Sequence, residues 1–235
     1  MKRTLIALAV MAAVTAPLAA QAAPKVYGKL NLSVEQYEKN YEDVTKQDES
    51  YSRLQSNASR FGLKGEDEIS ATLSAVYLIE WGVDADTAGV TDLKGRNRYL
   101  GIKSQDFGTI KLGAYDTYLK LAQDRADIFN DLFGDMEYVI AGENRVNNVV
   151  GYESPKLLDA LQVNVMLQTQ DNVTPQPNGL SSSVTYSNED RGVYVALAMD
   201  NNMTGKTALS GVRESDTVRL VATYKIGDLF LSGVY

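Results

Sequence analysis

The feature that most constrains this chain is an alternation of apolar and polar residues that recurs along most of its length. Between residues 70 and 83, the odd-numbered positions are apolar and include Leu73, Ile79 and Trp81, whereas the even-numbered positions include Thr72 and Glu80. Successive side chains of a β-strand point to opposite faces, so the pattern predicts a strand with one apolar and one polar face. A helix would repeat its apolar positions every three or four residues instead.

About eleven segments of this kind are predicted, which makes the fold all-β and antiparallel. They span residues 25–39, 51–64, 70–83, 96–103, 109–115, 145–153, 161–169, 181–187, 193–199, 216–225 and 229–235. The alternation in the segment 96–103 is imperfect, because Leu100 and Ile102 fall on its otherwise polar face.

The predicted connections alternate between short and long. The short ones are 65–69, 104–108, 154–160, 188–192 and 227–228, and the long ones are about 40–50, 84–95, 116–144, 170–180 and 200–215. Strands joined in this way form an up-and-down meander whose two ends differ. Short turns at one end and long loops at the other are typical of β-barrels of the outer membrane.

The N-terminus indicates export. Lys2 and Arg3 precede a short apolar run, and Ala20 and Ala22 provide the small residues of a cleavage site. This pattern predicts a signal peptide over residues 1–22, followed by one barrel domain over residues 23–235. No later stretch holds about 18 consecutive apolar residues, which a membrane-spanning helix would need.

An exported chain of this kind is either a soluble β-protein or a membrane barrel, and alternation alone does not separate the two. Three features favour the barrel. They are the export signal, the strand length of about ten residues, and the tyrosines Tyr77, Tyr152 and Tyr224, which lie on apolar faces near strand ends.

Composition argues against catalysis. The chain has no cysteine and no histidine, so it lacks a thiolate nucleophile, the usual general base and the commonest metal ligand. Its formal charge of −7 argues against a nucleic-acid partner. The acidic residues Glu66, Asp67 and Glu68 fall in a predicted tight turn, where we interpret them as solvated charges and not as a glycosidase pair. We expect no catalytic residues, no metal site and no cofactor.

Several segments resemble the general porins of Gram-negative bacteria, most closely those of the proteobacterial type. The resemblance covers most of the chain after residue 22, in the family's order and spacing. The segments are 25–31 (KVYGKLN), 59–67 (SRFGLKGED), 96–101 (RNRYLG), 106–113 (DFGTIKLG), 129–135 (FNDLFGD) and 143–155 (ENRVNNVVGYESP).

The resemblance implies a transmembrane, antiparallel, up-and-down β-barrel in the cell outer membrane, usually of about sixteen strands and usually a homotrimer. Such a barrel is a water-filled channel through which ions and small hydrophilic solutes diffuse. Its other implied partners are outer-membrane lipid and lipopolysaccharide. Since only about eleven strands are predicted here, we expect the chain to be truncated at its C-terminus.

The resemblance also implies that the long connection 116–144 folds into the lumen and narrows it. The basic wall of this constriction is carried over to Lys29, Arg60, Arg96, Arg98 and Arg145. Arg98 is included because it has the same strand parity as Arg96 and should therefore face the lumen. The acidic side is carried over to Asp124, Asp127 and Asp131, and Asp135 is expected to cap the loop's turn.

This sequence departs from the family at two places. Ala114 stands where many relatives have a further arginine, and Tyr118 stands where proline is common. Asp127 and Asp131 could instead cap a helical turn within 126–133. The acidic composition weakly favours cations as the permeating ions.

Two other classes of function stay open. A substrate-specific channel would show an aromatic track or a cluster of lysines along the lumen, and the sequence shows neither. A barrel enzyme or an adhesin is the third class. An outer-membrane hydrolase normally needs a histidine base, and an adhesin would rely on the long connections 170–180 and 200–215.

Overall fold

A computed structural model of the chain describes residues 23–39, 49–88, 93–169, 178–207 and 211–235. The predicted signal peptide, residues 1–22, lies outside this part, as do most of the predicted connections 40–50 and 170–180. Among the described residues, no helix is long and apolar enough to cross a membrane.

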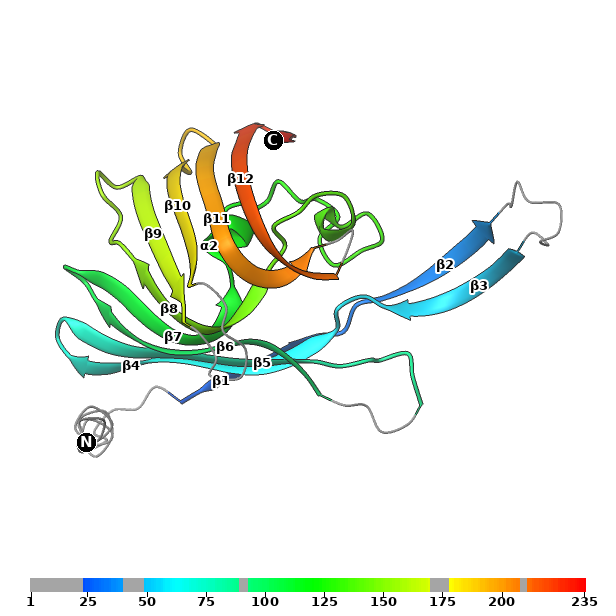
Figure 1. Ribbon diagram of the computed structural model, residues 1–235, viewed down its shortest axis with the longest axis horizontal. Coiled ribbons are helices and arrows are strands. Elements are labelled where there is room, and N and C mark those ends of the chain that lie inside the picture. The colour runs from blue at the N-terminus through cyan, green and yellow to red at the C-terminus, as the bar shows by residue number, and fades with distance from the viewer. Residues whose placement is uncertain (1–22, 40–48, 89–92, 170–177, 208–210) are drawn as a thin grey trace.

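Eleven strands form one antiparallel sheet that curves like a trough around an inner segment (Figure 1). They are β1 (Lys25–Lys29), β4 (Arg60–Ser70), β5 (Leu73–Gly82), β6 (Lys94–Ser104), β7 (Gly108–Asp116), β8 (Arg145–Glu153), β9 (Leu161–Gln168), β10 (Gly179–Asn188), β11 (Val193–Thr207), β12 (Gly211–Ile226) and β13 (Leu229–Val234). From β4 onward each strand pairs with the next strand of the chain, which confirms the predicted up-and-down order. In the described part, β1 and β13 are the two edges.

The predicted segments 25–39 and 51–64 are each two strands, so the described chain has thirteen strands. Their outer halves, β2 (Leu32–Lys39) and β3 (Glu49–Ser56), pair with each other in a separate hairpin that projects from the main sheet (Figure 1). The break occurs where Ala58 takes a left-handed backbone conformation with φ of 49°. At this break the Asn31 amide donates a hydrogen bond to Ser59 Oγ at 3.0 Å, so it bonds to a side chain and not to the backbone of a neighbouring strand.

Two predicted connections are wrong. The segment 65–69 lies within β4, and the turn falls at residues 71–72. The acidic residues of this segment can lie within a strand because one of them, Glu66, forms an ion pair of 2.9 Å with Lys103 on the inner face of the sheet. Much of the predicted connection 200–215 is also strand, since β11 and β12 stay paired as far as Thr207 and Gly211. Polar composition alone did not separate a loop from a paired strand there.

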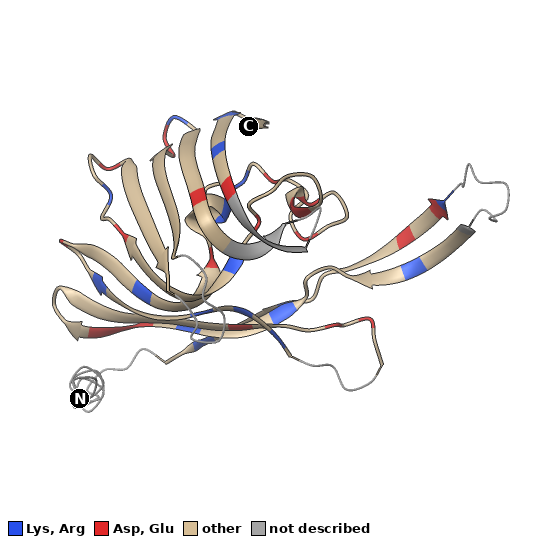
Figure 2. Cartoon of the chain, viewed as in Figure 1, with Lys and Arg blue, Asp and Glu red and all other residues tan. Residues whose placement is uncertain are grey.

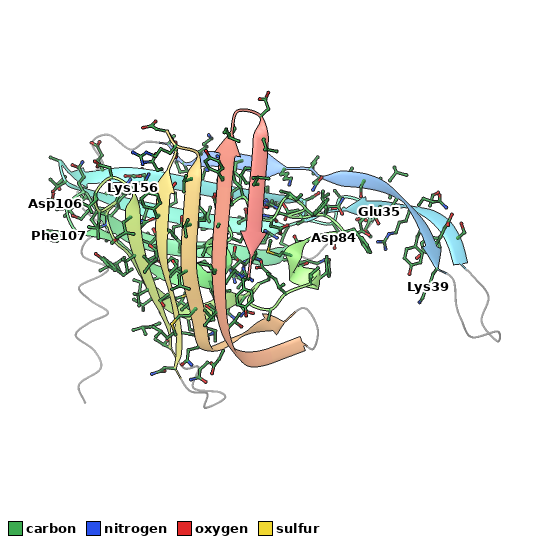
Figure 3. All side chains as sticks on the ribbon, turned by 90° about the horizontal axis from the view of Figure 1, so that it is seen from above. Glu35, Lys39, Asp84, Asp106, Phe107 and Lys156 are labelled. Carbon is green, nitrogen blue, oxygen red and sulfur yellow. The ribbon has the colours of Figure 1, made fainter. Side chains whose placement is uncertain are left out.

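The outer face of the sheet is apolar and solvent-exposed. It carries Leu112, Val150, Leu197 and Leu220, which are between 38% and 55% exposed. A surface of this kind suits a hydrocarbon environment. Figure 3 shows the two ends of the sheet, with Asp106, Phe107 and Lys156 at the short-turn end and Asp84 at the end of the long connections.

Residues 117–144, which we name the inner loop, pack inside the curve (Figure 1). The loop contains α2 (Tyr118–Leu121), whose N-cap Thr117 accepts from the Lys120 amide, and the short 3-10 helix η2 (Met136–Tyr138). Two apolar clusters hold it against the sheet. The first is Tyr115, Tyr118, Val146, Val149, Met166 and Met203, and the second is Leu119, Ala122, Ala126, Ala196, Ala198 and Val221. Burial of these side chains fixes where the loop's charged tip lies.

Candidate functional site

Between the inner loop and the strands β4 to β8 lies a cavity of about 580 Å³, which we name the charged cavity. Its lining includes Arg60, Arg96 and Arg145 from the wall and Asp131 from the loop. Figure 2 shows residues of both charges along the strands at the base of the curve. The structure therefore brings together three of the predicted basic residues and one of the predicted acidic residues.

Asp131 connects the inner loop to the basic wall. Its Oδ2 atom accepts from Arg60 Nη1 at 2.7 Å and from Lys29 Nζ at 3.0 Å. The loop's turn is fixed by Asp135, as expected, because its carboxylate accepts from the amides of Asp131 and Glu137 at 2.7 and 2.8 Å. Burial alone would raise the pKa of Asp131, but the hydrogen bonds from Arg60 and Lys29 hold it below its ordinary value.

The basic wall contains a carboxylate of its own, Glu80 of β5. Its Oε1 accepts from Arg96 Nε at 2.7 Å, and its Oε2 accepts from the Tyr27 hydroxyl at 2.8 Å and lies 3.6 Å from Arg60 Nε. Glu80 pairs across the sheet with Gly62, whose missing side chain leaves room for the Tyr27 ring. Sequence reasoning placed Glu80 on the polar face but gave it no role in the site.

Arg145 is held by a second carboxylate of the wall. Its Nη2 atom lies 3.0 Å from Asp116 Oδ1, and its Nε donates to Asn97 Oδ1 at 2.8 Å. Asn97 also donates to Asp116 Oδ2 at 2.8 Å, which closes a network of three side chains. Sequence reasoning missed Asp116 and Asn97. The available signal was that Asp116 ends β7 where the longest connection begins and that Asn97 lies near the start of β6, next to Arg96.

The two other predicted loop carboxylates do not line the charged cavity. Asp127 is buried and accepts from the amides of Phe129 and Met136 at 3.1 and 3.3 Å, so it organises the loop as the capping alternative expected. Burial raises the pKa of Asp127. Asp124 is exposed in a left-handed conformation with φ of 45°, away from the basic wall. Only Asp131 therefore brings a predicted loop charge to the arginines.

The strand register does not place Arg98 on the same face as Arg96, because β6 contains a bulge, but Arg98 does line a second cavity of about 480 Å³ together with Arg96, Lys120 and Arg145. The pairing with β5 shifts between Ile79, opposite Arg98, and Trp81, opposite Gly95, so Arg96 and Asn97 both lie across from Glu80. An extra residue in one strand reverses the face of the residues beyond it. Arg98 thus shares the outer face with Leu100, and the bulge also explains the imperfect alternation of this segment.

The root of the inner loop is fixed by a buried ion pair that the sequence did not reveal. Arg219 of β12 is 2% exposed, and its Nη1 donates to Glu143 Oε1 at 2.7 Å. Its Nη2 donates to the Ala141 carbonyl at 2.8 Å, and Lys120 Nζ lies 3.4 Å from Glu143 Oε2. The loop is therefore tied to β12 at its root and to β1 and β4 at its tip.

This arrangement sets side chains of opposite charge around the charged cavity. Among the residues that the structure describes, no cluster of metal-ligating side chains occurs. A curved antiparallel sheet, apolar outside and charged inside, with a loop folded onto its inner wall, defines the class of membrane β-barrel channels.

Comparison with known sequences gives the family. Residues 7–235 match the family model described as Gram-negative porin, and the chain belongs to this family, whose members are channels and not enzymes. It is 28% identical over 240 residues to outer membrane protein U of Vibrio vulnificus, covering all of this chain and 68% of that protein. It is 27% identical over 249 residues to the major outer membrane protein P.IB of Neisseria sicca, covering all of this chain and 65% of that protein. These relatives are outer-membrane proteins, and the cell outer membrane is accordingly the location of this chain.

Among solved structures, the anion-selective porin from Comamonas acidovorans superposes with a TM-score of 0.70 at 20% sequence identity. The match covers 90% of this chain and 66% of that porin, and it shows a common fold. The chain thus spans about two thirds of the length of these relatives.

Proposed function

We propose that the complete protein forms a water-filled channel through which ions and small hydrophilic solutes diffuse passively across the outer membrane. The observation that carries this proposal is the contact of the inner-loop residue Asp131 with Arg60 and Lys29 of the wall, beside the charged cavity. Family membership and the shared fold support it. In this proposal Lys29, Arg60, Arg96 and Arg145 form the cationic side of the constriction.

Opposed charges on two walls create a field across the narrow part of a pore. Water and dipolar solutes align in such a field, whereas large apolar solutes must give up hydration to enter. At about 0.1 M salt the field decays over about 10 Å, so only solutes inside the constriction experience it. Arg60 and Arg96 flank Glu80, and this carboxylate keeps the two guanidinium groups from repelling each other.

Ion selectivity in this proposal depends on a small imbalance of charge. The cavity lining carries six carboxylates and five cationic side chains: Glu35, Glu80, Asp116, Asp131, Asp135 and Glu137 against Arg53, Arg60, Arg96, Lys120 and Arg145. Lys29, which contacts Asp131, makes the two signs equal in number, so we infer weak cation preference from the acidic composition of the whole chain and not from the lining. The structural neighbour from Comamonas acidovorans is described as anion-selective, which is the opposite of the preference that we infer for this protein.

Two further parts of the proposal concern assembly. We infer that residues 1–22 are removed on export and that 23–235 belong to the barrel domain. We also infer a homotrimer, supported by family membership and by the trimer form of OmpT from Vibrio cholerae, which superposes with a TM-score of 0.56. Mass measurement of the detergent-extracted protein tests the trimer, and a monomer mass would contradict it.

The full-length protein, purified from outer membranes and added to a planar bilayer, should give stepwise, ohmic conductance. Replacing Asp131→Asn should move the reversal potential in a salt gradient toward anions, because it removes the loop charge that faces Arg60. Asp106→Asn is the matched control, since Asp106 lies at the short-turn end (Figure 3).

Absence of steps, with barrel folding verified by heat-modifiable migration on gels, would refute the channel. Equal reversal potentials for both Asn variants would refute the placement of Asp131. Conductance that saturates with one solute would indicate a substrate-specific channel instead.

A further inference from the structure

The tip of the inner loop gives the charged cavity an aromatic corner. Phe133 and Tyr138 both line the cavity, and they are 77% and 59% exposed. Burial of an aromatic ring is favourable, so two rings left open beside a charged cavity are unusual. Within the part of the chain that the structure describes, neither ring stacks on another ring or lies under a cationic side chain. Both rings are therefore open to a solute that enters the cavity.

Backbone hydrogen bonds hold this corner in a fixed shape. Asp127 accepts from the Met136 amide at 3.3 Å, and Asp135 accepts from the Glu137 amide at 2.8 Å. These two contacts fix the start of the 3-10 helix η2, whose last residue is Tyr138. A site that is already ordered loses less free energy when a solute binds to it.

The charges of the cavity lining are paired except at this corner. Each cationic side chain of the lining forms an ion pair with a carboxylate: Arg53 with Glu35, Arg60 with Asp131 and Glu80, Arg96 with Glu80, Lys120 with Glu143, and Arg145 with Asp116. Among the described residues, Asp135 and Glu137 form no ion pair. Partial burial, and after it the charges of Glu137 and Asp135, raise the pKa of Tyr138, so both carboxylates lie near its hydroxyl group. The negative charge without a cationic partner is therefore beside an aromatic ring.

The corner belongs to the charged cavity more than to the second cavity. Glu137 and Tyr138 line both cavities, but Phe133 and Asp135 line only the charged cavity. The second cavity is also lined by Arg98, which forms no ion pair among the described residues and would repel a cation. A positively charged solute would therefore meet the four corner residues from the charged cavity.

We propose that the corner formed by Phe133, Asp135, Glu137 and Tyr138 binds small solutes that carry a quaternary ammonium group, with choline as the simplest probe. Cations of this kind bind over the faces of aromatic rings, and nearby carboxylates add electrostatic attraction. A quaternary ammonium group has no N–H to donate, so it gains more from a ring face than a primary amine does. The inference rests on the proposed channel, because the corner lies in its lumen, and it names one class of solute that the lumen retains.

The first test adds choline chloride to a planar bilayer that holds the full-length protein in potassium chloride. Choline should interrupt the potassium current, because a bound solute occupies the narrow part of the lumen. The neutral carbon analogue of choline, in which a tert-butyl group replaces the trimethylammonium group, should interrupt it far less, since it lacks the charge. Phe133→Leu and Tyr138→Leu should each weaken the block by about threefold, the value expected for an exposed cation–π contact.

The control variants separate the rings from other effects. Phe107→Leu is the matched control for Phe133→Leu, because Phe107 is also 77% exposed but lies at the short-turn end of the sheet (Figure 3). It should leave the block unchanged. Tyr138→Phe keeps the ring and should retain the block, whereas Glu137→Gln removes a charge and should weaken it.

The inference is overturned if choline leaves the potassium steps uninterrupted, or if its neutral analogue blocks equally well. It is also overturned if Phe133→Leu and Tyr138→Leu both keep the full block. Titration of choline into the full-length protein in an uncharged detergent, followed by nuclear magnetic resonance of the choline signals, measures binding without conduction. Binding there with no channel steps in the bilayer would contradict the proposed function and support the site, whereas steps without binding would contradict the site alone.

Discussion

At the scale of single residues, the constriction is an alternating array of charges and not a bare row of arginines. Glu80 lies between Arg60 and Arg96, and Asp131 lies between Arg60 and Lys29. Each guanidinium is therefore oriented by a carboxylate before any solute arrives. Preorganised charges of this kind act on a permeating ion without first having to rearrange.

Glu80 provides the sharpest test at this scale. Replacing Glu80→Gln should shift the reversal potential toward anions, because it leaves Arg60 and Arg96 without the charge that they share. The loss of charge-assisted hydrogen bonds should also cost about 1–3 kcal/mol of stability. Reversal potential in a potassium chloride gradient measures the first effect, and the thermal midpoint of the folded barrel measures the second.

Glu66→Gln is the matched control for this change. Glu66 pairs with Lys103 on the same inner face, but both side chains are nearly half exposed and lie toward the short-turn end. Exposed pairs contribute little to stability. An equal shift in both variants would show that net lumen charge matters and that the position of Glu80 does not.

At the scale of strands and loops, the alternation of residues predicted the main sheet but not its bulges. Strict alternation along β6 predicted that Arg98 shares the inner face with Arg96. The register shift next to Glu80 places Arg98 on the outer face of the strand instead. The misplaced Leu100 and Ile102 were the sign of this shift, because apolar side chains on a polar face indicate a change of register. Contacts that join distant segments, such as Glu80 with Arg96 and Arg219 with Glu143, leave no comparable local pattern.

The buried pair of Arg219 and Glu143 should fix the inner loop. Glu143→Gln keeps the shape of the side chain but leaves Arg219, which is 2% exposed, without its anion. Breaking one partner of a buried pair typically costs about 3–5 kcal/mol. We expect a lower thermal midpoint together with noisier single-channel current, because the loop loses its connection to β12.

The control for this change is Glu189→Gln, which removes one exposed carboxylate in the turn between β10 and β11. It should alter neither the midpoint nor the noise. If Glu143→Gln lowers the midpoint while the current stays quiet, the pair stabilises the barrel without holding the loop in the lumen.

At the scale of the whole molecule, the inner loop connects strands on opposite sides of the curved sheet. Its root lies on β12 and its tip lies against β1 and β4, so the position of Asp131 depends on strands that are far apart in the sheet. The loop's length and its place in the family pattern made it predictable as a constriction. The contact of the loop's root with β12 could not be predicted from the sequence, because it depends on how the sheet curves.

Lowering the pH should remove the negative charges of the lumen in two stages. Ordinary carboxylates take up protons near pH 4, whereas Asp131 keeps its charge to lower pH, because Arg60 and Lys29 hold its pKa below the ordinary value. A carboxylate with a depressed pKa stabilises the folded loop above its unfolded pKa, and that contribution is lost as the pH falls through the lower, folded pKa. Reversal potentials of the unmodified protein and of Asp131→Asn should both move toward anions as the pH approaches 4. The difference between the two proteins should persist there and disappear only on further acidification. Convergence of the two curves above pH 4 would show that the contacts of Asp131 with Arg60 and Lys29 do not form in the open channel.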